Sequence, residues 1–371
     1  MSKQRMSPNH YVDVVETMEE ELAITQRPEL GRDVFTHACP PWLPPGARGL
    51  YGGVLVGGSL AAAQSTVPPE VLVHSSHCNF LIGASAQSPI FYHVERVRDG
   101  RSFATRRVDA MQDGKCIFTA TLSFMRPEGQ PGQSVSHAHV MPHIELPEEV
   151  DSQEGTYQGR PFQVVDLPTT PALYPTKQKL RRLIRIQRRI DHNKNHSRNP
   201  DTNRAVSSAV QSASVLSQNL GVLAYLSDFY VINTATRIYG LPMFSPQSYI
   251  KRSVSALDRA GAAEKEKAIT HLENMIRTEK LEMNQLAQVS LSTKTNNLQV
   301  GMMVTLSHTV FFHNQQAVRP HEWMLFEMES PWAGDNRGIA VQRTWNKEGL
   351  LIMTCVQEGL IRTEPRDKGL L

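Results

Sequence analysis

Two polar residues interrupt apolar segments of the chain, at places where they could do chemistry. Asp228 stands within the apolar stretch 221–239, and Gln357 interrupts an apolar strand near the end of the sequence. An aspartate inside an apolar helix costs helix propensity and burial energy, which argues against a purely structural role. Such a carboxylate can accept a proton from a water molecule or polarise it. Thr305 on its own is typical of an ordinary β-branched strand residue.

A serine nucleophile is an alternative to be weighed. The sequence Gly57-Gly58-Ser59-Leu60-Ala61 nearly matches the GxSxG motif of serine hydrolases, but the final glycine is absent. That motif places its serine on a sharp turn between a strand and a helix. No alternating pattern of strands and helices surrounds Ser59, so this pattern does not favour a serine hydrolase.

The elements that must position these residues follow from an internal repeat. The segments 101–126 and 337–362 are equal in length, and each holds two β-rich runs around a polar turn, at 112–115 and 346–349. In both copies an apolar helix and a strand come first: 53–66 and 76–80 in the first copy, and 221–239 and 307–311 in the second, with further strands expected at 90–97 and 322–329. Helices that are apolar nearly all round are covered by other elements. We therefore expect an α+β protein with two units, each an antiparallel sheet wrapped around a long central helix.

The repeat also predicts how the chain is divided. We expect a first unit at 25–135, a linker with a basic segment at 136–205, and a second unit at 206–365; prolines punctuate the stretch 131–175. A helical insertion is expected at about 245–300 of the second unit, and its segment 263–287 has the spacing of an exposed amphipathic helix.

The composition excludes several classes of protein. The chain has 371 residues, of which 40% are hydrophobic, with 39 Lys and Arg against 36 Asp and Glu. No apolar run approaches the roughly 18 residues of a membrane span, and no hydrophobic signal segment opens the sequence. The four cysteines form no CxxC pair and have no histidines at zinc-finger spacing, so we expect neither a zinc site nor disulfides. A net charge of +3 does not indicate a surface that binds nucleic acid.

Several ordered motifs give the chain a family resemblance. They are Tyr51-Gly52-Gly53, VHSSH at 73–77, RDGRSFATRR at 98–107, LAYLSDF at 223–229, EWML at 322–325 and VQEGLIR at 356–362. In these blocks, which extend from about residue 30 to 363, the chain resembles the type II, TesB-like acyl-CoA thioesterases. The resemblance implies two tandem hot-dog units, a fold in which an antiparallel sheet wraps around one helix.

The resemblance also implies a catalytic site. In the family an Asp, a Thr and a Gln hold and activate a water molecule, and these positions fall on Asp228, Thr305 and Gln357. The water hydrolyses a fatty acyl-CoA or a related thioester, and the CoA thiol, with a pKa of roughly 8.5, leaves without much help from an acid. No metal or cofactor is expected. Because the repeat places Leu60, His74 and Thr121 at the matching positions, we expect one catalytic centre per chain.

Four residues are candidates for substrate binding: Gly52, Gly53, His74 and Ser307. Gly52 and Gly53 could let CoA approach the start of a helix, or could let the helix pack closely, and both interpretations stay open. Ser307 stands where the family commonly has Asp. His77 and His308 are placed at matching positions of the repeat, which favours a structural role for both.

The basic segment 177–190 contains seven Lys and Arg and no acid. Leu180, Leu183, Ile184 and Ile190 favour an amphipathic helix here. A solvated face is the usual meaning of such a run, and the alternative is a docking patch for CoA phosphates or an anionic partner.

The expected partner is acyl-CoA, with a homo-oligomer possible in addition. A catalytically silent acyl-CoA-binding or scaffold protein is the alternative function, because of Ser307 and the insertions. Hydration of enoyl-CoA would require an Asp and His pair within one motif, which is not found. Family members are often peroxisomal, but the final residues Lys368-Gly369-Leu370-Leu371 do not match a Ser-Lys-Leu signal, so peroxisome and cytoplasm both stay open.

Overall fold

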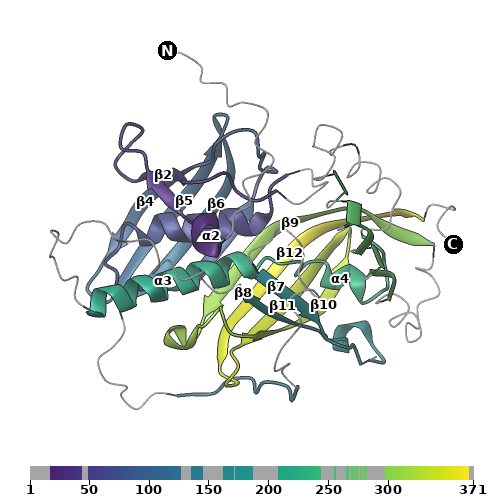
Figure 1. Ribbon diagram of the computed structural model, residues 1–371. Helices are drawn as coiled ribbons and strands as arrows, with labels where there is room; N and C mark the ends of the chain where they lie inside the picture. The colour runs from purple at the N-terminus through teal and green to yellow at the C-terminus, as the bar shows by residue number, and fades with distance from the viewer. Residues whose placement is uncertain are drawn as a thin grey trace.

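One antiparallel sheet of 12 strands runs through the molecule (Figure 1). The computed structural model describes residues 17–43, 49–126, 135–144, 162–170, 172–186, 208–243 and 297–366, with scattered residues between 255 and 281. The strands are β1 (Ile24–Gln26), β2 (Val34–His37), β3 (Leu72–Phe80), β4 (Phe91–Asp99), β5 (Phe103–Gln112), β6 (Lys115–Met125), β7 (Phe162–Asp166), β8 (Leu180–Ile186), β9 (Leu298–Phe312), β10 (Met324–Gly334), β11 (Arg337–Trp345) and β12 (Leu351–Pro365).

The strand order repeats in the two halves of the sheet. It runs β1-β2-β4-β5-β6-β3 and continues as β9-β12-β11-β10-β8-β7. Outward from the centre, each half therefore has a first strand, a hairpin, a further strand and an outer pair in the same order. The predicted duplication is thus present in the strand topology.

Strands β3 and β9 join the two halves into one sheet. They pair from Ser75 opposite Phe311 to Asn79 opposite Ser307, and Cys78 lies directly opposite His308. Strand β12 pairs with the other edge of β9, so the middle of β9 lies between β3 and β12.

Both predicted hairpins form, with different turns. In the β5–β6 hairpin, Asp113 and Gly114 have φ angles of 50° and 73°, as a tight primed turn requires. The β11–β12 hairpin has a longer loop, in which Gly349 has a φ of 81° and the Asn346 side chain accepts a hydrogen bond of 2.9 Å from the Leu350 N–H.

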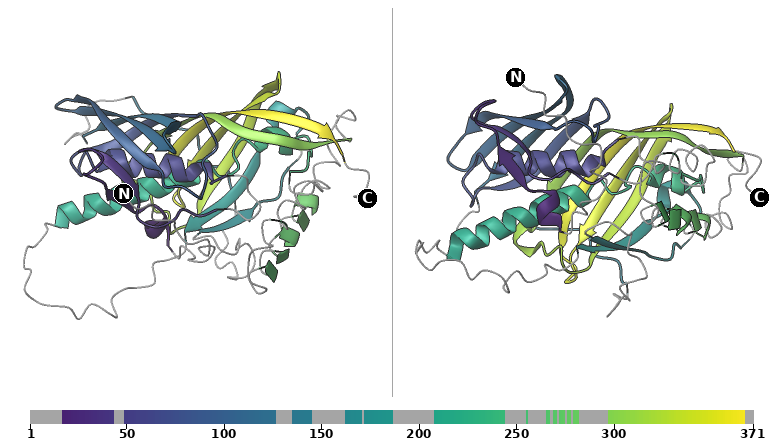
Figure 2. Two further views of the ribbon diagram at one scale, coloured as in Figure 1. Left: turned by 90° about the horizontal axis from the view of Figure 1, so that it is seen from above. Right: turned by 45° about the horizontal axis from the view of Figure 1, so that its top comes forward.

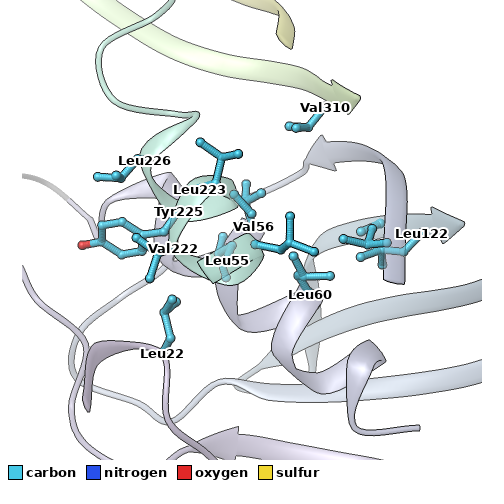
Figure 3. Close-up of a cluster of buried hydrophobic side chains, with 14 of the residues drawn as sticks. Leu22, Leu55, Val56, Leu60, Leu122, Val222, Leu223, Tyr225, Leu226 and Val310 are labelled. Atoms are coloured by element: carbon cyan, nitrogen blue, oxygen red, sulfur yellow. The ribbon is translucent and has the colours of Figure 1, made fainter. Parts of the chain in front are cut away.

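Two helices lie side by side on one face of the sheet (Figure 2). They are α2 (Gly52–Gln64) and α3 (Ser208–Leu226). Of two short helices, α1 (Met18–Glu21) contacts α3, and α4 (Thr234–Arg237) lies against β10 and β11. Short 3-10 turns occur at Pro175–Lys177 and Gln315–Ala317. Leu55 and Val56 of α2 meet Leu223 of α3 in a buried apolar cluster that reaches Leu122 on β6 and Val310 on β9 (Figure 3). No helix in the described ranges is long and apolar enough to cross a membrane.

The predicted bounds of the second helix are wrong. The helix begins at Ser208, well before the predicted 221, and ends at Leu226 rather than at 239. After Leu226 the chain turns, with Tyr230 at a φ of 54°, before the short helix α4. The early turns are rich in Ser, Gln and Asn, so an apolar pattern does not reveal them, and the turn after Leu226 leaves Asp228 outside the helix.

Glycine at position 53 lets α2 approach α3. A Cβ atom there would overlap the carbonyl oxygen of Tyr225 and the ring of Tyr51. Replacing Gly53 with alanine is expected to lower the free energy of unfolding by about 1–3 kcal/mol, as overpacking does in a close-packed interior. Urea denaturation measures this change.

Gly221 of α3 provides the matched control. A Cβ atom there would meet only Leu22 Cδ1, at 3.6 Å, which is an ordinary contact. Gly221→Ala is therefore expected to leave stability unchanged or to raise it by up to about 1 kcal/mol through helix propensity. Equal destabilisation by both substitutions would refute the close approach at Gly53.

The helix predicted in the basic segment 177–190 is wrong. Residues 180–186 form strand β8, which pairs with β10 and β7, and residues 187–190 lie outside the described part. Arg181 donates to Glu327 at 2.8 Å, and Lys179 forms an ion pair with Glu329. These two basic side chains thus meet acids of β10, which lie far away in the sequence and could not be predicted from a local pattern.

The predicted linker also contains sheet structure. Strands β7 and β8 lie within 136–205 and occupy the places that β1 and β2 hold in the other half. Of the helix predicted at 263–287, only scattered residues between 265 and 281 are described; these are helical, and Leu272 is buried. The rest of that segment lies outside the described residues.

Candidate active site

Asp228 lies buried in the turn that follows α3. Its carboxylate accepts a hydrogen bond from Gln357 Nε2 and another from the backbone N–H of Gly53. Burial raises the pKa of Asp228 to about 7, and these two hydrogen bonds act in the opposite direction. The site therefore holds a carboxyl group that can exchange a proton near neutral pH.

Gln357 is fixed by contacts on both ends of its amide. Its Oε1 accepts a hydrogen bond of 2.8 Å from the backbone N–H of Ile232, just after the turn that carries Asp228. Its Nε2 donates to Asp228 and lies 3.1 Å from Nδ1 of His308. The amide is fully buried, so these partners replace the water that it would otherwise bind.

Two residues join this group that the sequence analysis did not place there, namely His308 and Ser227. His308 lies opposite Gln357 across the β9–β12 pair, and its Nε2 is 2.8 Å from Ser227 Oγ. The matching of His308 with His77 is wrong. His308 is fully buried and lies opposite Cys78, whereas His77 lies opposite Thr309 and is exposed on the other face of the sheet. His308, Val310 and Phe312 are two residues apart along β9 and so share a face of the sheet. The apolar residues at 310 and 312 therefore indicated that His308 is buried as well.

Thr305 is near this group but does not bond to it. It pairs with Gly359 on β12, and a bulge between Glu358 and Gly359 shifts the register there. Paired residues share a face, and a Cβ at Gly359 would meet Ile232, so Thr305 lies on the same face of the sheet as Gln357. Within the described ranges no hydrogen bond joins the Thr305 hydroxyl to Asp228 or Gln357.

The four predicted substrate-binding residues are spread over the structure. Gly52 and Gly53 begin α2 beside Asp228, and a Cβ on Gly52 would lie 2.5 Å from Asp228 Oδ2. His74 lies on β3 with its ring against the edge of Phe103, at 6.0 Å between centroids, and burial lowers its pKa. Ser307 alternates with the buried His308 along β9, so its side chain is on the opposite face.

Neither Ser59 nor Cys355 has the surroundings of a nucleophile. Ser59 is buried inside α2, and its Oγ has no hydrogen-bond partner in the part of the chain that is described. The Cys355 thiol lies 3.6 Å from His308 Nδ1, but burial raises its pKa well above the ordinary value, with Asp228 and Cys78 adding to the effect. A thiolate is therefore disfavoured at this position. No three His, Cys, Asp or Glu side chains of the described residues gather as a metal site.

Solved structures with the same architecture define the fold class. An acyl-CoA thioesterase II, TesB2, from Mycobacterium marinum has a TM-score of 0.58 at 23% identity, with 95% of this chain and 99% of that chain covered. A hot-dog protein of unknown function from Alicyclobacillus acidocaldarius has a TM-score of 0.54 at 16% identity, with 93% and 97% covered. The large antiparallel sheet is thus that of a hot-dog protein.

The family follows from sequence comparison. The acyl-CoA thioesterase N-terminal domain matches residues 39–125, and the acyl-CoA thioesterase C-terminal domain matches residues 162–361. Acyl-coenzyme A thioesterase 8 of Rattus norvegicus is 29% identical over 332 residues, which cover 88% of this chain and 83% of the relative. Acyl-CoA thioesterase 2 of Haemophilus influenzae is 27% identical over 323 residues, with 85% and 89% covered. The chain belongs to the TesB-like acyl-CoA thioesterase family, a family of thioester hydrolases.

Proposed function

We propose that this protein hydrolyses acyl-CoA thioesters to the free acid and CoA, with a water molecule as the attacking group. The observation that carries the proposal is the buried Asp228, whose pKa is raised to about 7 and whose carboxylate is held by Gln357. A base with a pKa near the working pH accepts a proton efficiently and is still largely ionised.

The proposed reaction assigns one task to each residue. Asp228 accepts a proton as the water oxygen bonds to the thioester carbon, and Thr305, on the same face of the sheet, offers its hydroxyl to that water. Gln357 holds the Asp228 carboxylate in place. The carbonyl oxygen is proposed to lie at the start of α2, against the backbone N–H of Gly52. The intermediate collapses as the carbon–sulfur bond breaks, and the CoA thiolate takes up a proton from Asp228 or from solvent.

Gly52 is proposed to keep the approach to the carboxylate open. A side chain at this position would overlap Asp228 Oδ2 and, at 2.9 Å, the ring of Phe80. Gly52, Gly53 and Phe80 belong to the first half of the chain, whereas Asp228 and Gln357 belong to the second. We infer that the site needs both halves, as two tandem hot-dog units with α2 and α3 as their central helices.

The test is release of free thiol from a panel of acyl-CoA substrates between about pH 5 and pH 9. The active form of Asp228 is the carboxylate, and its pKa is about 7, so kcat/KM is expected to rise about tenfold per pH unit below that value and to level off above it. Binding of acyl-CoA without thiol release would instead support the silent binding protein. A rate that is independent of pH across this range would contradict Asp228 as the base.

A further inference from the structure

The hydrogen atoms around Ser227 define the protonation of His308. Ser227 Oγ lies 2.7 Å from the carbonyl oxygen of Ala224, which can only accept, so the single hydroxyl hydrogen points there. The same Oγ lies 2.8 Å from His308 Nε2 and must accept that bond. The imidazole therefore carries its hydrogen on Nε2.

This tautomer leaves a lone pair on the other ring nitrogen, directed at Gln357. His308 Nδ1 lies 3.1 Å from Gln357 Nε2, whose two N–H groups thus meet Nδ1 and the Asp228 carboxylate. Gln357 Oε1 accepts from Ile232, so each polar atom of this amide has a defined partner. A rotated amide would place Oε1 against the lone pair of His308 and against a carboxylate, both of which only accept.

We propose that His308, held by Ser227, is a positioning residue that orients the Gln357 amide so that its N–H faces Asp228. This inference rests on the proposed function of Asp228 and Gln357. His308 is fully buried, and burial lowers its pKa to about 3, so the ring stays neutral and Nδ1 stays an acceptor at physiological pH. The Cys355 thiol is the other titratable group against the ring, at 3.6 Å and 3.8 Å from its nitrogens.

Two substitutions separate the two ends of the imidazole. In His308→Asn the amide oxygen takes the place of Nδ1 and can still accept from Gln357, but the contact with Ser227 is lost. In His308→Gln the longer side chain reaches the place of Nε2 near Ser227 and provides no acceptor at Nδ1. Comparable melting temperatures of the two variants allow their rates to be compared directly.

The expected result is a difference in kcat between these variants. His308→Gln should lower kcat by about tenfold or more at nearly constant KM, while His308→Asn should stay within about threefold of wild type. In a Gln357→Ala background the two variants should have equal rates, because the amide to be oriented is gone. Equal losses in the presence of Gln357 would overturn the inference, provided that wild type turns over acyl-CoA.

A second measurement does not depend on activity. In the intact wild-type protein with ¹⁵N-labelled histidine, NMR is expected to show His308 as the neutral tautomer with hydrogen on Nε2 between about pH 5 and pH 8. A hydrogen on Nδ1, or a charged ring, would overturn the inference whatever the enzyme assay shows. Failure of wild type to release thiol from any acyl-CoA would refute the proposed function and leave this spectrum as the separate test of the hydrogen-bond geometry.

Discussion

Replacing Asp228 with asparagine is expected to lower kcat by about 10²–10⁴-fold, the range that a positioned base contributes. Asparagine has nearly the same shape and can still accept the hydrogen bond from Gln357, but it cannot take up a proton from water. Stopped-time thiol release with saturating acyl-CoA measures the change. Circular dichroism should show an unchanged fold.

The stability of this variant gives a second expected result. In the folded protein Asp228 has a pKa of about 7, against an ordinary value of 3.8. Between these values the folded state holds a proton that the unfolded chain has lost, so wild type loses stability as the pH rises from about 4 to about 7. Asparagine does not titrate, and the variant should therefore be more stable relative to wild type at pH 8 than at pH 4.

Glu21 provides the matched control for Asp228. Burial also raises its pKa to about 7, and its carboxylate accepts from the Trp42 N–H at 3.2 Å and from the Tyr225 hydroxyl at 3.3 Å. Glu21→Gln should show a similar pH-dependent gain in stability and retain most of its activity. A wild-type rate in Asp228→Asn, or an equal loss in Glu21→Gln, would contradict the assignment of the base.

Gln357→Leu is expected to lower kcat by about 10²-fold and to shift the pH–rate profile to higher pH. The hydrogen bond from Gln357 lowers the pKa of Asp228, so its loss raises that pKa above the wild-type value of about 7. A higher pKa leaves less carboxylate at neutral pH, and the midpoint of the profile moves accordingly. The shift distinguishes loss of this hydrogen bond from general damage to the fold.

Gln342→Leu is the matched control on the neighbouring strand β11. Gln342 is a buried glutamine in the same sheet, but its Nε2 has no hydrogen-bond partner among the described residues. Its replacement removes an unsatisfied group, so stability should stay equal or rise, and the pH–rate midpoint should not move. A shifted midpoint in both variants would show that the effect is not specific to Gln357.

The features that could be predicted from sequence are those with local causes. The Asp113-Gly114 turn is an example, because two adjacent residues determine the backbone geometry there. Strand β8 could not be predicted, since Glu327, the partner of its Arg181, and Glu329, the partner of the adjacent Lys179, lie on β10, well over a hundred residues away in the sequence.

In the candidate site, too, features with local causes could be predicted and features that depend on distant residues could not. Asp228 and Gln357 were predicted mainly from the family resemblance, with a polar residue in an apolar segment as the sign in the sequence itself, and the structure joins them by a hydrogen bond. That Asp228 follows α3 instead of lying within it depends on the turn at Tyr230. His308 was set aside because a repeat in sequence does not reveal which face of a strand is buried, and a register error of one residue reverses that face.

The pairing of β3 with β9 affects both the folding of this chain and its resistance to aggregation. The contact joins residues more than two hundred positions apart, so its loop-closure entropy is large and it is expected to form late in folding. Separation of the halves would expose the unpaired backbone groups of two long strands, which are templates for aggregation. In this duplicated chain, each half therefore pairs with the edge strand of the other half. Removal of either half would leave β3 or β9 as an exposed, unpaired edge strand.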